Sequence, residues 1–212
     1  MNRAEASTPA SVNFHFDPLC PYAWRTALWI REARNVRPIN VHWRLFSLEI
    51  INRKEGVEPD YVNGFGWAAL RSLAYARRKY GNEGIEKLYI ALGNAQHGGS
   101  KENIRDQAVV ERCAQEAGFE PGLVANALAD ESTIQDVLND HEGAVKSYHA
   151  FGVPTIALEN SNVGFYGPVI IDVPHGEEAG ELWDHTAWML RQPNVFELKR
   201  DRAQVELGPV LA

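Results

Sequence analysis

The placement of strand-forming segments limits the fold of this 212-residue chain more than any other sequence feature. Alternating apolar residues predict one strand at 12–16 and a second at 39–45, and helical spacing at 22–34 separates them. Because parallel strands need a crossover of this kind, we expect these two strands to pair in parallel. Strand-like alternation then returns at 155–158 and 163–166.

Helical spacing fills most of the chain between those strand-forming ends. One helix is predicted to begin near Asp106, and another at Ser132, where Ser132-x-x-Gln135 matches a capping box. A last helix is predicted to begin near Gly176. The tail at 197–212 is charged and then contains a Gly-Pro pair, so we expect it to be weakly ordered.

The order of these elements predicts an α/β protein. A β-α-β unit, a run of helices and a β-β-α unit follow one another, which is the order of a thioredoxin-like fold split by an all-helical insertion. We therefore expect a thioredoxin-like domain made of residues 1–60 and 151–212, with a helical insertion domain at 61–150.

Composition limits the partners that this chain can have. Its net charge of −7 repels nucleic acid, and no apolar run approaches the ~20 residues that span a bilayer. The first eleven residues lack the apolar core of a signal peptide, and two cysteines cannot build a disulfide framework. We expect a cytoplasmic protein with reduced thiols and no nucleic-acid or membrane partner, either monomeric or homodimeric.

Motifs for common cofactors are missing or incomplete. The seven histidines show no metal-site spacing, so no metal is expected. Gly64-x-Gly66-x-x-Ala69 imitates a dinucleotide-binding turn, but residues 58–63 do not form the buried strand that must precede such a turn. No nucleotide cofactor is expected either.

The segment that carries the most chemistry is 17–24, Asp-Pro-Leu-Cys-Pro-Tyr-Ala-Trp. It places Cys20 after a predicted strand and at the start of a predicted helix, where unpaired N–H groups and the helix dipole stabilise anions. A thiol in that position can have its pKa lowered from ~8.5 to about 3.5–7.5, which favours the nucleophilic thiolate. The position predicts a reactive cysteine, and the alternative is a buried cysteine that acts as a small hydrophobic residue.

The chain resembles the DsbA-like branch of thioredoxin folds in two segments. Its counterpart of the active-site segment is Phe16-Asp17-Pro18-x-Cys20-Pro21-Tyr22-x-Trp24, and its counterpart of the cis-proline loop is Gly152-Val153-Pro154-Thr155-Ile156. Within that branch the chain most resembles the actinobacterial mycothiol-dependent nitroreductase group, with supporting segments at 88–95, 165–169 and 176–184. The resemblance implies an oxidoreductase or transferase that uses mycothiol, or another low-molecular-weight thiol, on a small electrophile or nitroaromatic.

The resemblance also indicates pocket residues. It places Asn52 in the substrate or thiol pocket, although a turn role is the alternative, and it places an aromatic pocket residue near Tyr61. Tyr22 and Trp24 are expected to wall the site, with a core role as the alternative for Trp24. His97, beside two glycines, is a weaker candidate for the mouth of the insertion, with a structural role as its alternative. The helical insertion is expected to cover Cys20 and to supply the pocket.

The cis-proline loop completes the candidate site. We expect the Val153-Pro154 bond to be cis and to face Cys20, with the backbone of Val153 presented to the bound thiol. The candidate binding residues, with Cys20 as the nucleophile, are Pro21, Tyr22, Asn52, Tyr61, Val153 and Pro154.

The chain departs from the nitroreductase group at position 23. That group resembles dithiol oxidoreductases with Cys-x-x-Cys, whereas this chain has Ala23 three residues after Cys20. Cys113 lies on a helical stripe that is predicted to be core. The sequence therefore predicts one-cysteine chemistry, in which a small thiol resolves a mixed disulfide or is conjugated to an electrophile.

Two further functions stay open. Kappa-class glutathione transferases and 2-hydroxychromene-2-carboxylate isomerases share this architecture, but they often carry serine at the position of Cys20. The other is a redox-inactive thioredoxin-fold module that binds a client or metabolite without turnover, and Ala23 keeps that alternative open.

Overall fold

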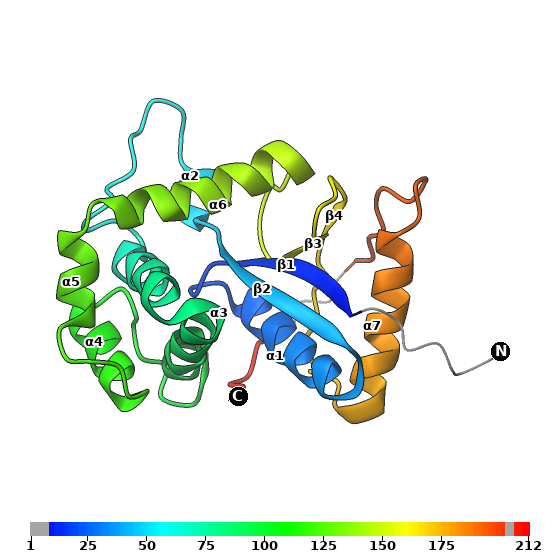
Figure 1. The fold of residues 1–212 in the computed structure, drawn as a ribbon, viewed down its shortest axis with the longest axis horizontal. Coiled ribbons are helices and arrows are strands. Elements are labelled where there is room, and N and C mark those ends of the chain that lie inside the picture. Colours follow the sequence, from blue (N-terminus) through cyan, green and yellow to red (C-terminus); the bar gives the residue numbers. More distant parts are fainter. Residues whose placement is uncertain (1–8, 202–205) are drawn as a thin grey trace.

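The computed structural model describes residues 9–201 and 206–212, with a four-stranded sheet at its centre (Figure 1). The strands follow the order β2-β1-β3-β4 and are β1 (Ala10–Phe16), β2 (Ile39–Leu45), β3 (Thr155–Leu158) and β4 (Gly164–Tyr166). β1 and β2 are parallel, whereas β3 is antiparallel to both β1 and β4. The predicted β-α-β opening and its parallel pairing are therefore confirmed.

Two helices pack together beside the sheet. α1 (Pro21–Val36) connects β1 to β2, and α7 (Gly176–Leu190) lies next to it (Figure 1). The Trp29 indole N–H of α1 donates to the Ala179 carbonyl of α7 at 3.0 Å, and both residues are fully buried. An indole buried in this way needs a hydrogen-bond acceptor, so this contact fixes how the two helices meet.

Five helices lie between β2 and β3: α2 (Leu48–Asn52), α3 (Trp67–His97), α4 (Gln107–Glu116), α5 (Leu123–Ala129) and α6 (Ser132–Tyr148). Figure 1 shows α3, α4 and α5 grouped beside the β2 edge of the sheet. The buried Arg71 of α3 joins this group, because it donates to the Leu128 carbonyl (2.8 Å) and the Thr133 hydroxyl (2.9 Å). The helical stretch is as predicted, and its treatment as a separate domain at 61–150 stays a prediction. None of the described helices is both long and apolar enough to cross a membrane.

The start of α6 differs from the prediction. Ser132 is the first residue of the helix, and its N–H donates to the Asp130 carboxylate at 3.0 Å. The side chain of Gln135 donates to Asn139 instead of reaching back to the helix start. A charged carboxylate is the stronger acceptor at a helix N-terminus, so Asp130 takes the role and the predicted capping box is wrong.

The tail also differs from the prediction. Its last residues contact α1 and α3, since the Trp24 indole donates to the Val210 carbonyl (2.9 Å) and the Val210 N–H donates to the His97 carbonyl (3.1 Å). Residues 202–205 lie outside the described part of the chain. For 206–212 the expectation of weak order is wrong, because backbone groups make these contacts and composition does not record them.

Aromatic rings connect the sheet to α3 beneath the β1–α1 turn. The Phe16 ring of β1 stacks on Tyr89 of α3 with ring centroids 3.8 Å apart, and the Trp43 ring of β2 lies edge-on to Tyr89 at 5.8 Å. All three side chains are fully buried. Well-packed aromatic groups of this kind hold neighbouring elements in a fixed arrangement. The segment that follows Phe16 therefore begins from a rigid base.

Two buried histidines lie on the other side of β1. The His15 ring meets the Tyr148 ring of α6 at 5.8 Å, and the His141 ring of α6 lies 4.3 Å from the Phe46 ring. Burial lowers the pKa of His15 to about 3, with further lowering by the charges of Arg44 and His141. Burial likewise lowers the pKa of His141 to about 4. Both rings are therefore neutral in the folded protein at neutral pH.

These histidines predict acid sensitivity. The unfolded chain binds their protons below pH ~6.5, whereas the folded protein does not, so stability is full above that pH and is lost as the pH falls. Each group contributes a slope of about 1.4 kcal/mol per pH unit until its lowered pKa is reached. Neither ring nitrogen of His15 has a hydrogen-bond partner among the described residues, so His15→Phe should fold and lose one such slope.

Urea unfolding between pH 7 and pH 5 measures this effect. His185→Gln is the matched control, because His185 is exposed and its replacement should leave the wild-type slope unchanged. A His15→Phe protein that keeps the wild-type slope would show that His15 is not held neutral by the fold.

Candidate active site

Cys20 lies where β1 leads into α1, as the N-cap residue of that helix. Its sulfur accepts a hydrogen bond from the Ala23 N–H at 3.4 Å, and its thiol donates to the Val153 carbonyl at 3.5 Å. Pro21 occupies the first position of the helix, where the N–H that proline lacks has no helical partner. The Cys20 side chain is only 6% exposed. The sulfur is thus held between a helix N-terminus and the loop before β3.

Burial controls the acidity of this thiol. It raises the pKa of Cys20, and the nearby Asp17 raises it further, while the N–H groups of Ala23 and Tyr22 act in the lowering direction. The expectation of a thiol with a lowered pKa is therefore wrong for this structure, because loss of hydration outweighs the helix N-terminus. Cys20 rests as a protonated thiol at neutral pH, with its proton directed at the Val153 carbonyl.

Asp17 fixes the turn that carries Cys20. Its fully buried carboxylate accepts one hydrogen bond from the Leu19 N–H (2.9 Å) and one from the Leu48 N–H (2.8 Å). Burial raises the pKa of Asp17 to about 6, against the lowering effect of those two N–H groups. The carboxyl group thereby joins the active-site turn to the start of α2. In the sequence, Asp17 is recognisable as an acidic residue directly after an apolar strand. The sequence analysis used it only as part of the motif that carries the family resemblance, and did not predict this structural role.

The loop before β3 provides the opposite wall of the site. The Val153-Pro154 peptide bond is cis, as predicted, and the Val153 carbonyl is the group that contacts Cys20. The Pro154 carbonyl accepts from the Gly167 N–H at 2.8 Å, which holds this loop to the end of β4. The structure therefore brings together Cys20, Pro21, Val153 and Pro154 from the predicted set.

The other predicted residues lie in different surroundings. Tyr22 is half-buried on the first turn of α1, directly beside the site. Asn52 is exposed at the end of α2, and its side chain donates back to the Leu48 carbonyl at 2.9 Å. The Tyr61 ring packs edge-on against Trp67 with centroids 4.7 Å apart. In the structure both Asn52 and Tyr61 make local contacts, and their roles in binding stay predictions.

The loop that contains Tyr61 nevertheless returns to the active-site turn. Gly66 has a φ of 82° and caps α3, and a Cβ atom at this position would lie 2.8 Å from a methyl carbon of Leu19. Glycine suits both the left-handed backbone and the close approach. The glycines that resemble a dinucleotide-binding turn therefore have a structural role: Gly66 caps the start of α3 and lets it pack against Leu19.

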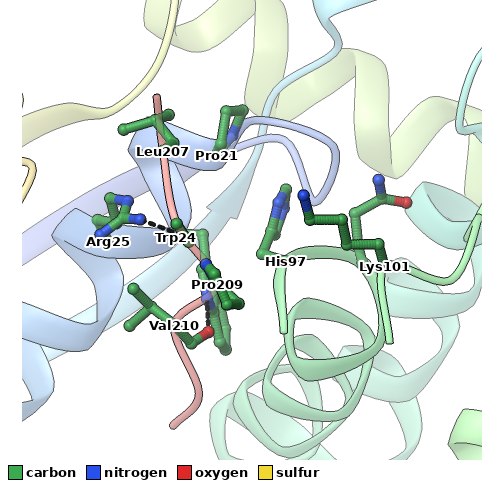
Figure 2. Close-up of a pocket in the computed structure, with 10 residues that line it drawn as sticks. Pro21, Trp24, Arg25, His97, Lys101, Leu207, Pro209 and Val210 are labelled. Carbon is green, nitrogen blue, oxygen red and sulfur yellow. Dashed lines mark hydrogen bonds between the residues drawn. The ribbon is translucent and has the colours of Figure 1, made fainter. Parts of the chain in front are cut away.

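A small cavity borders the site on the side of Pro21, and the sequence predicted little of it. Its volume is about 170 Å³, and Figure 2 shows its lining residues converging from α1, α3 and the tail. His97 lies at this cavity and donates from Nε2 to the Pro18 carbonyl at 2.9 Å, so the weaker candidate contacts the active-site turn. Trp24, which was expected to wall the site or to be core, also lines this cavity. The sequence missed the rest of the lining, which consists of Arg25, Gln96, Lys101, Leu207, Gly208, Pro209 and Val210.

Sequence comparison places the chain among known proteins. Residues 19–200 match the model of the family described as Rv2466c-like, mycothiol-dependent nitroreductase Rv2466c. The uncharacterized protein Rv2286c of Mycobacterium tuberculosis (strain ATCC 25618 / H37Rv) is 38% identical over 205 residues, which cover 93% of this chain and 85% of that protein.

Structural comparison identifies the fold. The probable DsbA oxidoreductase SCO1869 of Streptomyces coelicolor superposes with a TM-score of 0.64 at 18% identity, covering 96% of this chain and 99% of that one. The cytosolic disulfide reductase DsbM of Pseudomonas aeruginosa, solved with GSH, gives 0.59 at 13% identity over 84% and 99%. A 2-hydroxychromene-2-carboxylate isomerase gives 0.59 at 15% identity over 85% and 95%. The fold is thus the DsbA-like thioredoxin fold that the sequence predicted.

The buried thiol predicts how alkylation depends on pH. In a Cys113→Ala protein, which leaves one thiol, the iodoacetamide reaction rate at Cys20 should rise with a midpoint above ~8.5, the ordinary thiol value. Asp17→Asn should move the midpoint downward, because it removes the nearby negative charge. A wild-type midpoint below pH 7 would contradict the burial argument and restore the helix N-terminus as the controlling effect.

Proposed function

Because the chain belongs to the Rv2466c-like family of mycothiol-dependent nitroreductases, we propose that it is a thiol-dependent oxidoreductase that works through Cys20 alone. Its cosubstrate is mycothiol or another low-molecular-weight thiol, and its substrate is a small electrophile or nitroaromatic. The observation that carries the proposal is the position of the Cys20 sulfur, between the Ala23 N–H and the Val153 carbonyl, with alanine where a resolving thiol would stand.

The proposed reaction has two steps. In the first, the Cys20 thiol and one small thiol are oxidised together to a mixed disulfide, and their two electrons and two protons pass to the substrate. In the second, the thiolate of another small thiol attacks the sulfur of the attached small thiol, so the mixed disulfide breaks and Cys20 leaves as a thiolate that is then protonated. The net result is two small thiols converted to their disulfide and a substrate reduced by two electrons.

The site supports each step with groups that are already in place. The Ala23 N–H on the sulfur stabilises the Cys20 thiolate when it leaves in the second step. The Val153 carbonyl holds the thiol proton at rest and is the backbone group that a bound thiol or disulfide would meet. Because Cys20 is only 6% exposed, the bound ligand displaces water from a site that is already nearly closed.

The remaining predicted features fit around this reaction. We assign Pro21, Tyr22, Val153 and Pro154 to the binding of the small thiol, on their positions around Cys20. The residue range 61–150 acts as an insertion domain that covers the site, with Asn52 and Tyr61 as pocket residues. A cytoplasmic location suits an enzyme that draws its electrons from a pool of reduced small thiols.

The two alternatives have less support. The isomerase neighbour is similar at 15% identity, which speaks for a shared fold and not for its reaction. A binding module without turnover remains compatible with Ala23, and it requires that Cys20 form no adduct with small thiols.

The variant Ala23→Cys tests whether Cys20 reacts without a resolving thiol from the protein. Ala23 is fully buried one turn beyond Cys20, and a thiol there could attack a mixed disulfide on Cys20 from within the molecule. Loaded with thionitrobenzoate on Cys20, the wild-type protein should keep this label until a thiol is added. Ala23→Cys should release it unaided, at least tenfold faster, because the attacking group is held in place.

Ala23→Ser is the matched control, since serine has nearly the size of cysteine and forms no disulfide. Release of the label from the wild-type protein without added thiol would identify Cys113 as a resolving thiol and contradict one-cysteine chemistry. If Ala23→Cys forms a disulfide between Cys20 and the introduced thiol but no longer turns over the substrate, the result would indicate that the wild-type enzyme conjugates its substrate and does not reduce it.

A further inference from the structure

Residues 207–212, within the last described segment of the chain, form a strap across α1 and α3 (Figure 2). The Trp24 indole of α1 donates to the Val210 carbonyl at 2.9 Å, and the Val210 N–H donates to the His97 carbonyl of α3 at 3.1 Å. The Ala212 N–H donates to the side chain of Asn94 at 2.8 Å. The strap therefore lies as an extended segment between two helices and is held mainly by its backbone.

The strap lies against the same part of α1 that carries the nucleophile. Arg25 donates one guanidinium N–H to the Gly208 carbonyl and another to the Ile171 carbonyl. The contacts of the strap on α1 are therefore Trp24 and Arg25, which follow Cys20 within the first two turns. On α3 its partners are Asn94 and His97, and the His97 ring also donates to the Pro18 carbonyl of the active-site turn.

This placement makes the strap one wall of the cavity beside Pro21. Leu207, Gly208, Pro209 and Val210 line the cavity together with Pro21 and His97. With the strap in place the volume is about 170 Å³. Pockets that hold small-molecule ligands usually measure about 300–1,000 Å³, so this cavity admits a small substituent and excludes a larger one.

The strap is also suited to move. None of its residues is buried, and Leu211 keeps 64% of its surface exposed. The strap thus contributes little apolar burial, and segments of that kind open at a lower free energy than the core does. It further lies beyond residue 200, where the match to the family model ends.

We propose that the strap determines the size of the ligand that reaches Cys20: it is a displaceable wall of the cavity beside Pro21. With the strap docked, the site takes a small disulfide or electrophile whose substituent fits the cavity. A bulkier ligand must first displace residues 207–212 from Trp24, Arg25 and His97. The proposal rests on the proposed function only in taking Cys20 as the nucleophile.

The test compares two reagents on matched strap variants. Val210→Pro removes the N–H that donates to His97, whereas Val210→Ala keeps that N–H and serves as the control. A chain that stops after Glu206 removes the whole strap. All carry Cys113→Ala, because Cys113 lines a second cavity that Leu211 also borders. Labelling of Cys20 by iodoacetamide, a small reagent, and by fluorescein maleimide, a bulky one, is followed by mass spectrometry.

Val210→Pro and the shortened chain should raise the maleimide rate about tenfold relative to the iodoacetamide rate, and Val210→Ala should match the wild type. An unchanged ratio with normal iodoacetamide labelling overturns the strap proposal alone. An equal acceleration by both reagents also overturns it, because the strap would then be a structural clamp on α1. Absence of labelling by either reagent in every variant overturns the proposed function, and the strap proposal with it.

Discussion

The contact between the Cys20 sulfur and the Val153 carbonyl joins two parts of the chain that are 133 residues apart in sequence. It exists because β1 ends directly before the active-site turn and β3 begins directly after the cis-proline loop. The antiparallel pairing of His15 with Thr155 then places these two ends side by side. All the helices from α2 to α6 lie between the two halves of this contact in sequence, so the core of the fold must close before the site exists.

Closure of the fold also buries the groups that would otherwise ionise. The same loss of hydration raises the pKa of Cys20 and raises the pKa of Asp17 to about 6. A neutral thiol next to a partly protonated carboxyl group is a resting state that guards the sulfur from adventitious oxidation, because thiolates are the species that oxidise. Cys20 then becomes reactive only when a bound ligand favours loss of the thiol proton. The Ala23 N–H is positioned to stabilise the negative charge of the resulting thiolate.

The sequence predicted the parts of the structure that local pattern controls. Strand alternation and the proline at the start of α1 were sufficient to place β1, β2 and Cys20, whereas the cis Val153-Pro154 bond was expected from the family resemblance. The thiol pKa was predicted in the wrong direction, because the burial of Cys20 depends on distant segments that pack around it. The capping box at Ser132 failed since Asp130 is a stronger acceptor two residues earlier. The strap was missed because its contacts use backbone carbonyls, which any residue supplies.

Under the proposed function, Cys20 is the one protein thiol that forms a mixed disulfide with a small thiol, and a second small thiol then resolves it. Intact-mass measurement after incubation with oxidised mycothiol or oxidised glutathione tests it most directly, with Cys20→Ser as the control. We expect one adduct per chain, located on Cys20 by peptide mapping, absent from Cys20→Ser and removed by the same thiol in its reduced form. No adduct with either disulfide, or an adduct on Cys113, would contradict it.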